Sequence, residues 1–503
     1  MKIPFCLDEI KSSWKSNHKD FLFRGDGWLW VVIMILMMLS LFVIYSSTGR
    51  LAFQKHNGDT SFFLRKQLVL YVFGYAIILF FTKIPFKYYL KYAYWFLGFS
   101  VLLLLYASFS GHAINGAGRW IKLLGFTFQP SELAKITTVM VMARVICLSR
   151  ETSWYKFNWA DMICPLSVIA IIFFDNVSTA GLLFIACYLM LFMGRIKTKM
   201  FIKITGVITL FLVLFLSLVM FTPASIRDKM TEVSVLKRIP TFHNRIVNFF
   251  DDTPDDDNNF QLQQAKIAVA KGGIRGSGPG NSTQRNFLPH PYSDFIFAII
   301  LEEYGLAGCL VIFLTFLVIA VRIGVIVSRC TRVFPALLVM GLGVTIVLQA
   351  LIHMLVNVGL FPVTGQTLPL VSMGGTSLWL TCMSLGIILR ISYEFSPKYE
   401  EDLERMFKEE GGEPEEDEKQ NPSEDYYSED TTSGDTDYKG NSSEVTDYGD
   451  VSYDDSSHEN KYSDDKYSDD DVSSSNMYKN RDVIDDNIPD DIKEMLNRSK
   501  DEY

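Results

Sequence analysis

Residues Trp28 to Thr48 read Trp-Leu-Trp-Val-Val-Ile-Met-Ile-Leu-Met-Met-Leu-Ser-Leu-Phe-Val-Ile-Tyr-Ser-Ser-Thr, without one charged side chain. About 20 such residues in a helix are enough to cross the hydrocarbon core of a bilayer. Nine further apolar runs follow, so the sequence predicts an all-α, polytopic membrane protein with about ten transmembrane helices. The ten runs lie near residues 28–48, 66–82, 92–110, 129–148, 160–175, 177–193, 203–222, 293–321, 334–360 and 372–392.

The count of ten depends on a polar break between the fifth and sixth runs. Only Asp175 and Asn176 separate these two runs, so one hairpin could be gained or lost there. Lysine and arginine test the count, because loops on the cytoplasmic side are enriched in them. They cluster at residues 2–24, 83–91, 144–156, 195–203 and 322–332, on every second connection.

This alternation predicts that both termini are cytoplasmic. The first outer loop is an exception, with four basic residues between 49 and 66. The large outer, periplasmic loop, 223–292, does not test the rule, because long loops are translocated regardless of charge. Residues 1–27 form a polar cytoplasmic leader without a small-residue cleavage site, so the first run is expected to be a signal anchor.

The chain beyond the last run has a different composition. Residues 398–503 hold 36 acidic and 12 basic side chains, a net charge of −24, whereas the preceding 397 residues carry a net charge of +15. A segment so acidic and so poor in apolar residues cannot bury a core. We therefore expect a membrane body over 28–395 and a disordered acidic cytoplasmic tail over 396–503. This division excludes a soluble enzyme of uniform composition.

Several ionisable side chains lie in or beside the apolar runs, where they are costly and often mark function. Glu132 and Lys135 are three residues apart and share one helix face; an internal salt bridge and a binding role are equally open. Lys271 and Arg275 lie within a glycine-rich segment, 271–283, whose backbone N–H groups could bind a phosphate, although flexibility is the simpler interpretation. The segment is not a nucleotide-binding loop, because the Gly-Lys-Ser/Thr sequence is missing.

Three further features lie at the start of the eighth run, along the ninth run, and between the ninth and tenth runs. Asp294 lies where a polar loop meets an apolar run, a position suited to a general base or to a helix N-cap. Gln349, His353 and Asn357 recur every four residues on one face of the ninth run, where hydrogen bonding between helices is the favoured interpretation. The Pro/Gly-rich stretch 362–377 that follows suggests a re-entrant segment. The seven cysteines form no metal or redox motif.

Taken in order, four motifs closely resemble the SEDS family (shape, elongation, division and sporulation), over about residues 25–393. The motifs are Gly-Ala-Gly-Arg119-Trp120-Ile; Gln129-Pro-Ser-Glu132-Leu-Ala-Lys135; Leu288-Pro-His-Pro-Tyr-Ser-Asp294-Phe-Ile-Phe-Ala; and Pro362-Val-Thr-Gly-Gln-Thr-Leu-Pro-Leu-Val-Ser372-Met-Gly-Gly-Thr-Ser377. The spacing within the third and fourth motifs is more similar to the division branch than to the elongation branch.

The resemblance implies a peptidoglycan glycosyltransferase of the bacterial inner membrane that polymerises lipid II into glycan strands for septal cell-wall synthesis. The family's essential aspartate falls on Asp294, and its cavity residues fall on Arg119, Trp120, Glu132 and Lys135. The sequence departs from the family at Asn176, where an aspartate is usual, and at Met373, where a tyrosine is usual. A direct ionic role for position 176 is therefore in doubt.

The implied chemistry is inverting glycosyl transfer, with Asp294 as the base and cations stabilising the phosphate that leaves. Candidates for these cations are Arg119, Lys135, Lys271 and Arg275. A divalent cation, Mg or Mn, is a further candidate, with its ligands unassigned. The implied partners are the lipid II substrate, a class B penicillin-binding protein acting as transpeptidase, other divisome proteins and the membrane; no nucleic acid is expected. The alternatives are a lipid II flippase, an elongation-branch polymerase and a non-catalytic divisome scaffold.

Overall fold

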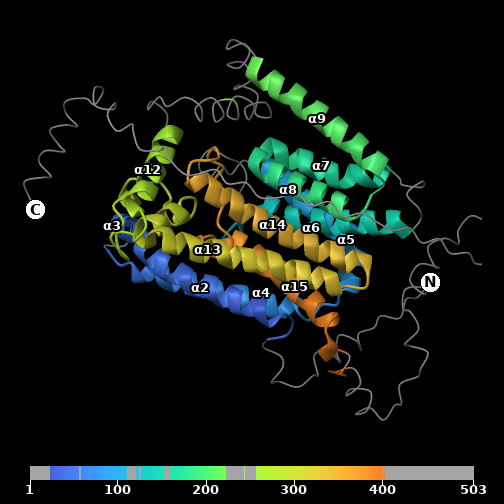
Figure 1. Cartoon of the computed structure of the whole chain (residues 1–503), viewed down its shortest axis with the longest axis horizontal. Coiled ribbons are helices and arrows are strands. Elements are labelled where there is room, and N and C mark those ends of the chain that lie inside the picture. Colours follow the sequence, from blue (N-terminus) through green and yellow to red (C-terminus); the bar gives the residue numbers. More distant parts are fainter. Residues whose placement is uncertain are drawn as a thin grey trace, which may run out of the picture. The chain divides into compact units, whose positions relative to one another are not determined.

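The computed structural model describes residues 23–55, 58–109, 121–123, 126–151, 159–196, 198–221, 243, 257–399 and 401–402 (Figure 1). Each of the ten predicted spans falls on a helix. These are α2 (Gly27–Ser47), α4 (Ser61–Phe81), α5 (Phe86–Phe109), α6 (Pro130–Glu151), α7 (Trp159–Asp175), α8 (Val177–Met193), α9 (Thr198–Phe221), α13 (Ile296–Arg329), α14 (Val333–Asn357) and α15 (Gly375–Glu394).

Six of the described helices are long and apolar enough to cross a membrane: α2, α4, α5, α13, α14 and α15. Shorter apolar stretches lie in α7, α8 and α9. Together they make the chain a multi-pass membrane protein, and the all-helical prediction is confirmed. The number of ten spans, the sidedness of the termini and the proposed domain limits stay predictions. The acidic tail beyond residue 402 and the first 22 residues lie outside the described residues.

Polar residues set several helix boundaries. Asp26 accepts a hydrogen bond from the Leu29 amide at 3.1 Å and so caps α2. Asn176 caps α8 in the same way, through the Thr179 amide at 3.4 Å. The predicted polar break is therefore a real boundary that separates α7 from α8. Helix α5 begins six residues before the predicted run and includes Lys87 and Lys91 in its first turns; such long side chains can extend toward the interface.

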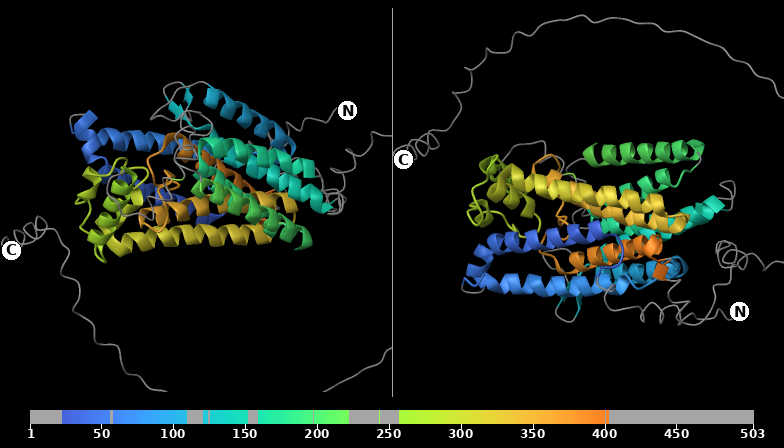
Figure 2. Two further views of the ribbon diagram at one scale, coloured as in Figure 1. Left: turned by 90° about the horizontal axis from the view of Figure 1, so that it is seen from above. Right: turned by 60° about the horizontal axis from the view of Figure 1, so that its bottom comes forward.

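The helices pack side by side in a bundle whose interior is built mainly from α2, α4, α6, α8, α13, α14 and α15. Helix α13 lies between α2 and α14, and α15 packs against α4 and α14 (Figure 2). Helix α9 lies at the edge, in contact with α8 through the ring of Tyr188 and its hydroxyl, 2.9 Å from Thr205 Oγ1. Large apolar side chains such as Phe42 and Leu102 stay exposed on the bundle, as expected for surfaces that face lipid.

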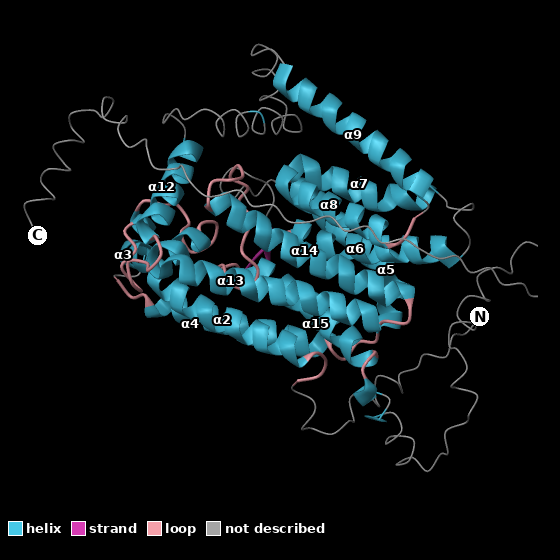
Figure 3. Cartoon of the chain, in the orientation of Figure 1, coloured by secondary structure: helices cyan, strands magenta, loops and turns pink. Residues whose placement is uncertain are grey.

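Three smaller elements lie outside the bundle helices. Strands β1 (Ile121–Leu123) and β2 (Phe126–Phe128) pair antiparallel, a hairpin that the sequence did not predict (Figure 3). Helix α3 (Gly49–Lys55) follows α2 directly. Helix α12 (Asp257–Gly272), within the predicted outer loop, packs against α13. Helices α3 and α12 lie at one end of the bundle (Figure 1), which is called the Asp294 end below.

Helix α13 is interrupted at Gly305, whose φ is 62° and ψ −152°. The interruption frees backbone groups that a helix would pair internally, and the glycine-rich segment takes them up. Ser277 N donates to Glu302 O at 2.8 Å, Gly278 N donates to Glu303 O at 2.9 Å, and Leu306 N donates to Gly273 O at 3.1 Å. The segment is therefore fixed to α13 by backbone hydrogen bonds.

Candidate active site at the Asp294 end of the bundle

Asp294 lies in a tight turn immediately before α13. The amides of Ser293 and Asp294 both donate to the carbonyl of His290, at 3.1 and 3.2 Å. His290 has a φ of 82°, a conformation that residues other than glycine adopt rarely and mostly in turns. Helix α13 begins at Ile296, and its N-cap, Phe295, carries no side-chain cap. Asp294 thus does not occupy the N-cap position that the sequence left open for it.

A clamp of three hydrogen bonds holds the backbone of this turn against the end of the ninth span. Three consecutive carbonyl groups each accept one bond from a residue near the start of α15 or the end of α14. Met373 N donates to Tyr292 O at 2.9 Å, Ser372 Oγ to Ser293 O at 2.7 Å, and Asn357 Nδ2 to Asp294 O at 3.1 Å. The backbone on both sides of the Asp294 side chain is therefore held by the end of α14 and by the stretch just before α15.

The carboxylate of Asp294 is half-buried. Its Oδ1 accepts a hydrogen bond from Ser293 Oγ at 3.0 Å. A Cβ atom added at Gly365 would lie 3.8 Å from Oδ2, so this glycine leaves space beside the carboxylate. Burial, and in second place the negative charge of Asp294, raise the pKa of Tyr292. Asp294 therefore lies close to a phenol that stays protonated at neutral pH.

The stripe on α14 connects its helix to the stretch 362–377. The predicted hydrogen bonding between helices is confirmed for Gln349, which accepts a bond from Lys135 of α6, and for Asn357, which accepts one from the Ala298 amide of α13, but His353 contacts the stretch instead. His353 Nδ1 lies 2.8 Å from Gln366 O, and Gln349 Nε2 donates to Thr367 O at 2.9 Å. Gln366 in turn donates to Thr179 Oγ1 at 2.8 Å, beside the Asn176 cap. Much of the stretch is buried within protein, which is how irregular backbone is tolerated at membrane depth.

Glu132 and Lys135 form a buried ion pair inside the bundle. Lys135 Nζ lies 3.0 Å from Glu132 Oε2 and donates to Gln349 Oε1 at 2.8 Å. The exposed fractions of the two residues are 7% and 4%. The structure thus shows the internal salt bridge that the sequence left open. Through Gln349 and Thr367 the pair is also linked to the loop beside Asp294. Its role toward substrate stays a prediction.

Lys271 and Arg275 occupy different surroundings from those expected of a phosphate-binding loop. Lys271 Nζ donates to Thr283 Oγ1 at 2.7 Å and lies 3.6 Å from Glu302 Oε1. Glu302 is fully buried and accepts further bonds from residues 282–284. Lys271 therefore neutralises a buried carboxylate, while Arg275 is exposed. The glycine-rich segment is attached to α13 by backbone hydrogen bonds, and its expected flexibility stays a prediction.

Two predicted site residues, Arg119 and Trp120, lie outside the described residues. Among the residues that are described, no group of three His, Cys, Asp or Glu side chains lies close enough to hold a metal ion. A cation at Asp294 would therefore depend on one carboxylate together with water and substrate oxygens. Mg²⁺ is often bound in this manner, next to a phosphate.

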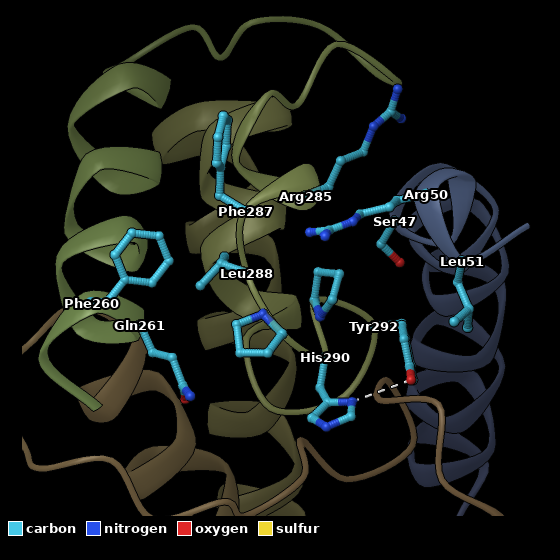
Figure 4. Close-up of a pocket in the computed structure, with 12 residues that line it drawn as sticks. Ser47, Arg50, Leu51, Phe260, Gln261, Arg285, Phe287, Leu288, His290 and Tyr292 are labelled. Carbon is cyan, nitrogen blue, oxygen red and sulfur yellow. Dashed lines mark hydrogen bonds between the residues drawn. The ribbon is translucent and has the colours of Figure 1, made fainter. Parts of the chain in front are cut away.

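The sequence did not reveal the pocket beside Asp294, which is lined by Arg50, Arg285 and Tyr292 among others (Figure 4). Its volume is about 540 Å³. Residues from α2, α3, α12 and the segment 285–292 meet there, although the chain separates them by more than 200 positions. The one signal in the sequence was the unexpected positive charge of the first outer loop, which includes Arg50.

The fold and the clamped aspartate define a class, a polytopic helical membrane protein with a polar site at one end of its bundle. Residues 27–396 match the family model described as FtsW, RodA and SpoVE cell cycle proteins. The chain belongs to this family, which is the SEDS family that its motifs resemble.

The relatives include proteins named as probable peptidoglycan glycosyltransferases FtsW. The one from Nitrosomonas europaea is 31% identical, over 72% of this chain and 91% of its own length. The one from Buchnera aphidicola is 32% identical, over 67% of this chain and 92% of its own. These names lie on the division side of the family.

Two solved structures share the fold. A peptidoglycan synthase complex, described as coordinating polymerisation and crosslinking, contains a chain with a TM-score of 0.56 and 21% identity, covering 74% of this chain and 99% of that one. A variant of the rod-shape-determining protein RodA of Thermus thermophilus has a TM-score of 0.52 and 20% identity, with coverage of 74% and 98%. At these identities the likeness concerns the fold.

Proposed function

We propose that the protein is a peptidoglycan glycosyltransferase that polymerises lipid II during septal cell-wall synthesis. The observation that carries the proposal is Asp294, a half-buried carboxylate in a clamped turn that lies beside a cationic pocket. The names of the FtsW relatives support both the reaction and the division pathway. A general base must lie within hydrogen-bond reach of its proton, and a fixed turn makes this position reproducible.

In the proposed reaction, Asp294 accepts the proton of the 4-hydroxyl group on the acceptor sugar. The hydroxyl oxygen then forms a bond to the anomeric carbon of the donor sugar. The bond from that carbon to the phosphate oxygen breaks, and undecaprenyl pyrophosphate leaves with the electron pair. Attack opposite the leaving group inverts the configuration at the anomeric carbon. One carboxylate is enough, because the leaving group is an anion that needs cations and not a proton.

Lys135 and the remaining predicted cations have separate places in this scheme. Lys135 is buried beside Glu132, so we propose that it supports the loop next to Asp294 in addition to its predicted contact with substrate. Arg119, Trp120, Lys271 and Arg275 stay proposed substrate contacts. Asp294 would be the residue that holds a divalent cation, Mg or Mn, which would supply further positive charge; the single carboxylate is compatible with weak binding only.

The proposed partners are lipid II, a class B penicillin-binding protein that crosslinks the new strands, and other divisome proteins. The complex with coordinated polymerisation and crosslinking, whose chain shares this fold, supports a transpeptidase partner. We propose the bacterial inner membrane as the location, with both termini in the cytoplasm, so that Asp294 faces the periplasm. Cell division and cell shape would then depend on the same active site.

The test is a polymerisation assay with the purified full-length chain. Fluorescent lipid II is supplied with and without the cognate transpeptidase, whose own active site is blocked, and the products are separated by length. We expect glycan strands that muramidase digests. Transfer of intact lipid II across proteoliposome membranes, without glycan strands in any combination, would contradict the proposal and support a flippase.

A further inference from the structure

The pocket beside Asp294 has two chemically distinct sides. Arg50 extends its guanidinium group from α3 toward the middle of the pocket, and Arg285 extends its own away from the centre to reach the carbonyl of Ser46, while Phe260 and Phe287 lie toward α12 (Figure 4). Both rings are more than a third exposed. The described lining residues include a histidine, His290, and no carboxylate. Such a surface suits a ligand with an anionic group at one end and an apolar chain at the other.

Both arginines are held in place and retain unused hydrogen-bond donors. Arg50 Nη1 donates to the carbonyl of Asn286, and Arg285 Nη1 donates to the carbonyl of Ser46 at 2.9 Å. These two bonds fix the start of α3 to the segment 285–286. A guanidinium group has five N–H donors in a planar fork. Arg285 Nε is buried without a partner among the described residues, and each side chain has further donors for a ligand.

The electrostatic balance makes Arg50 the principal charge. Arg285 lies close enough to Glu303 to interact with its carboxylate, whose Oε1 accepts a bond from Ser46 Oγ. The positive charge of Arg285 is therefore partly balanced by the carboxylate of Glu303. Arg50 is exposed and has no carboxylate partner among the described residues. For an anion in the pocket, Arg50 therefore offers a positive charge that no described carboxylate balances. Arg285 offers N–H donors that its bond to Ser46 holds in place.

The pocket also borders the catalytic turn. Tyr292 lines it and lies two residues before Asp294. Pro289, His290 and Pro291, which shortly precede Asp294, line the pocket as well. An anionic group bound in the pocket would therefore lie next to the turn that carries the proposed base.

We propose that Arg50 and Arg285 bind the diphosphate group of an isoprenoid-linked substrate, and that Phe260 and Phe287 contact the first isoprene units. The inference rests on the proposed function, because it assigns a place to the leaving group of that reaction. Arginine matches phosphate oxygens through paired N–H groups. Negative charge grows on the diphosphate as its bond to the sugar breaks, so fixed donors there favour the transition state. A volume of about 540 Å³ accommodates the diphosphate and a short part of the chain.

The experiment measures binding to the purified full-length protein in nanodiscs, without any turnover. The probes are undecaprenyl pyrophosphate, neutral undecaprenol and inorganic pyrophosphate. Arg50→Gln removes the principal charge and leaves the Arg285 bond to Ser46 in place, and Arg50→Lys tests for rescue by charge alone. The control is Arg65→Gln, because Arg65 is 71% exposed and pairs with Asp59 at 3.1 Å away from the pocket.

We expect Arg50→Gln to weaken undecaprenyl pyrophosphate binding by about tenfold, the effect of losing one or two charge-assisted hydrogen bonds. Undecaprenol binding and the Arg65→Gln protein should match the wild type, and Arg50→Lys should recover part of the loss. Unchanged binding of undecaprenyl pyrophosphate to Arg50→Gln would overturn the inference, as would an equal loss in Arg65→Gln. A loss confined to inorganic pyrophosphate would overturn the assignment to a lipid.

Binding and polymerisation can fail separately. If the wild type binds undecaprenyl pyrophosphate through Arg50 but makes no glycan strands, the result supports the diphosphate-binding site and contradicts the proposed polymerase function. If strands form and Arg50→Gln changes neither binding nor kcat/KM, the proposed function stands and the site falls. If both the site and the polymerase function are correct, we expect a lower kcat with Arg50→Gln, because the contact between Arg50 and the diphosphate strengthens as the leaving group gains charge.

Discussion

Glu132 and Asp294 are both acidic residues near the start of a membrane helix, and the structure gives them opposite surroundings. Glu132 is buried and has a fixed cation, Lys135 Nζ, at 3.0 Å. The charges of Glu132 and Lys135 therefore compensate each other inside the bundle. Asp294 is half-buried in a turn whose backbone is held by Asn357, Ser372 and Met373, and its Oδ1 accepts a bond from Ser293 Oγ. A carboxylate that is buried beside a cation, such as Glu132, indicates a structural role. A half-buried carboxylate on a backbone that is held in place, such as Asp294, indicates a catalytic role.

The largest effect should come from Asp294→Asn. The amide keeps the shape of the side chain and leaves the three clamp bonds to the backbone unchanged, but it cannot accept a proton. We expect strand synthesis to fall by about 10²–10⁴-fold, the usual contribution of a general base. The measurement is single-turnover lipid II polymerisation together with thermal unfolding in detergent. Near wild-type strand synthesis would show that Asp294 is not the general base. A lower unfolding temperature would show that its carboxylate stabilises the fold.

The Glu132 side of the comparison is tested by two variants. Glu132→Gln leaves Lys135 buried without its anion and should destabilise the protein by about 3–5 kcal/mol. Adding Lys135→Met removes the stranded charge and should restore most of the stability. We expect the double variant to insert but to polymerise poorly, because Gln349 loses the ammonium that links the pair to the loop beside Asp294. Full activity of the double variant would show that Glu132 and Lys135 serve only to neutralise each other.

A smaller effect is expected in the glycine-rich segment that supports the outer part of α13. In Gly276→Ala the new Cβ would overlap the carbonyl of Glu303, and the φ of 78° is unfavourable for alanine. Gly280→Ala is the matched control, because its φ is 81° and no atom lies within 4 Å of its Cβ position. We expect several-fold slower polymerisation for Gly276→Ala and about 1 kcal/mol of destabilisation without slower polymerisation for Gly280→Ala. Equal behaviour of the two variants would show that the close contact is unimportant.

The smallest effect should follow truncation after Asp402, which accepts a bond from the Tyr393 hydroxyl and is therefore kept. The acidic composition of the removed part cannot support a packed domain. We expect polymerisation by the truncated protein within about twofold of the full chain. A tenfold loss, about 1.4 kcal/mol of activation barrier, would show that the tail acts on the catalytic body.

Much of the fold could be predicted because membrane spans depend on composition over some 20 residues, a local property. The boundaries were less accurate where charged side chains extend a helix beyond its apolar part, as Lys87 and Lys91 do in α5. The break in α13 was not predicted. Its signal was Gly305 after two glutamates in an apolar run, but the break depends on backbone partners from residues 273–278, which lie in a different part of the chain.

The candidate site was predicted in part for the same reason. Asp294 could be singled out because its position between a polar loop and an apolar run is local. Asn357 was named as a hydrogen-bonding residue, but its partner, the carbonyl of Asp294, is fixed by the fold alone. Arg50 and Arg285 were not selected, because nothing in either segment indicates that the two lie beside one pocket.

The break at Gly305 has a consequence for how the protein opens. The amides of Ser277, Gly278 and Leu306 are protected only while the glycine-rich segment and α13 stay together. Hydrogen exchange at these three amides should therefore report one shared local unfolding event and not three independent ones. The first turns of α13 are shared between two sets of neighbours: Ala298 and Ile299 pack with residues of α12, whereas Ile296, Phe297, Ile300 and Leu301 belong to the main core of the bundle. Opening of the glycine-rich segment should therefore expose these three amides while the start of α13 stays packed in the bundle.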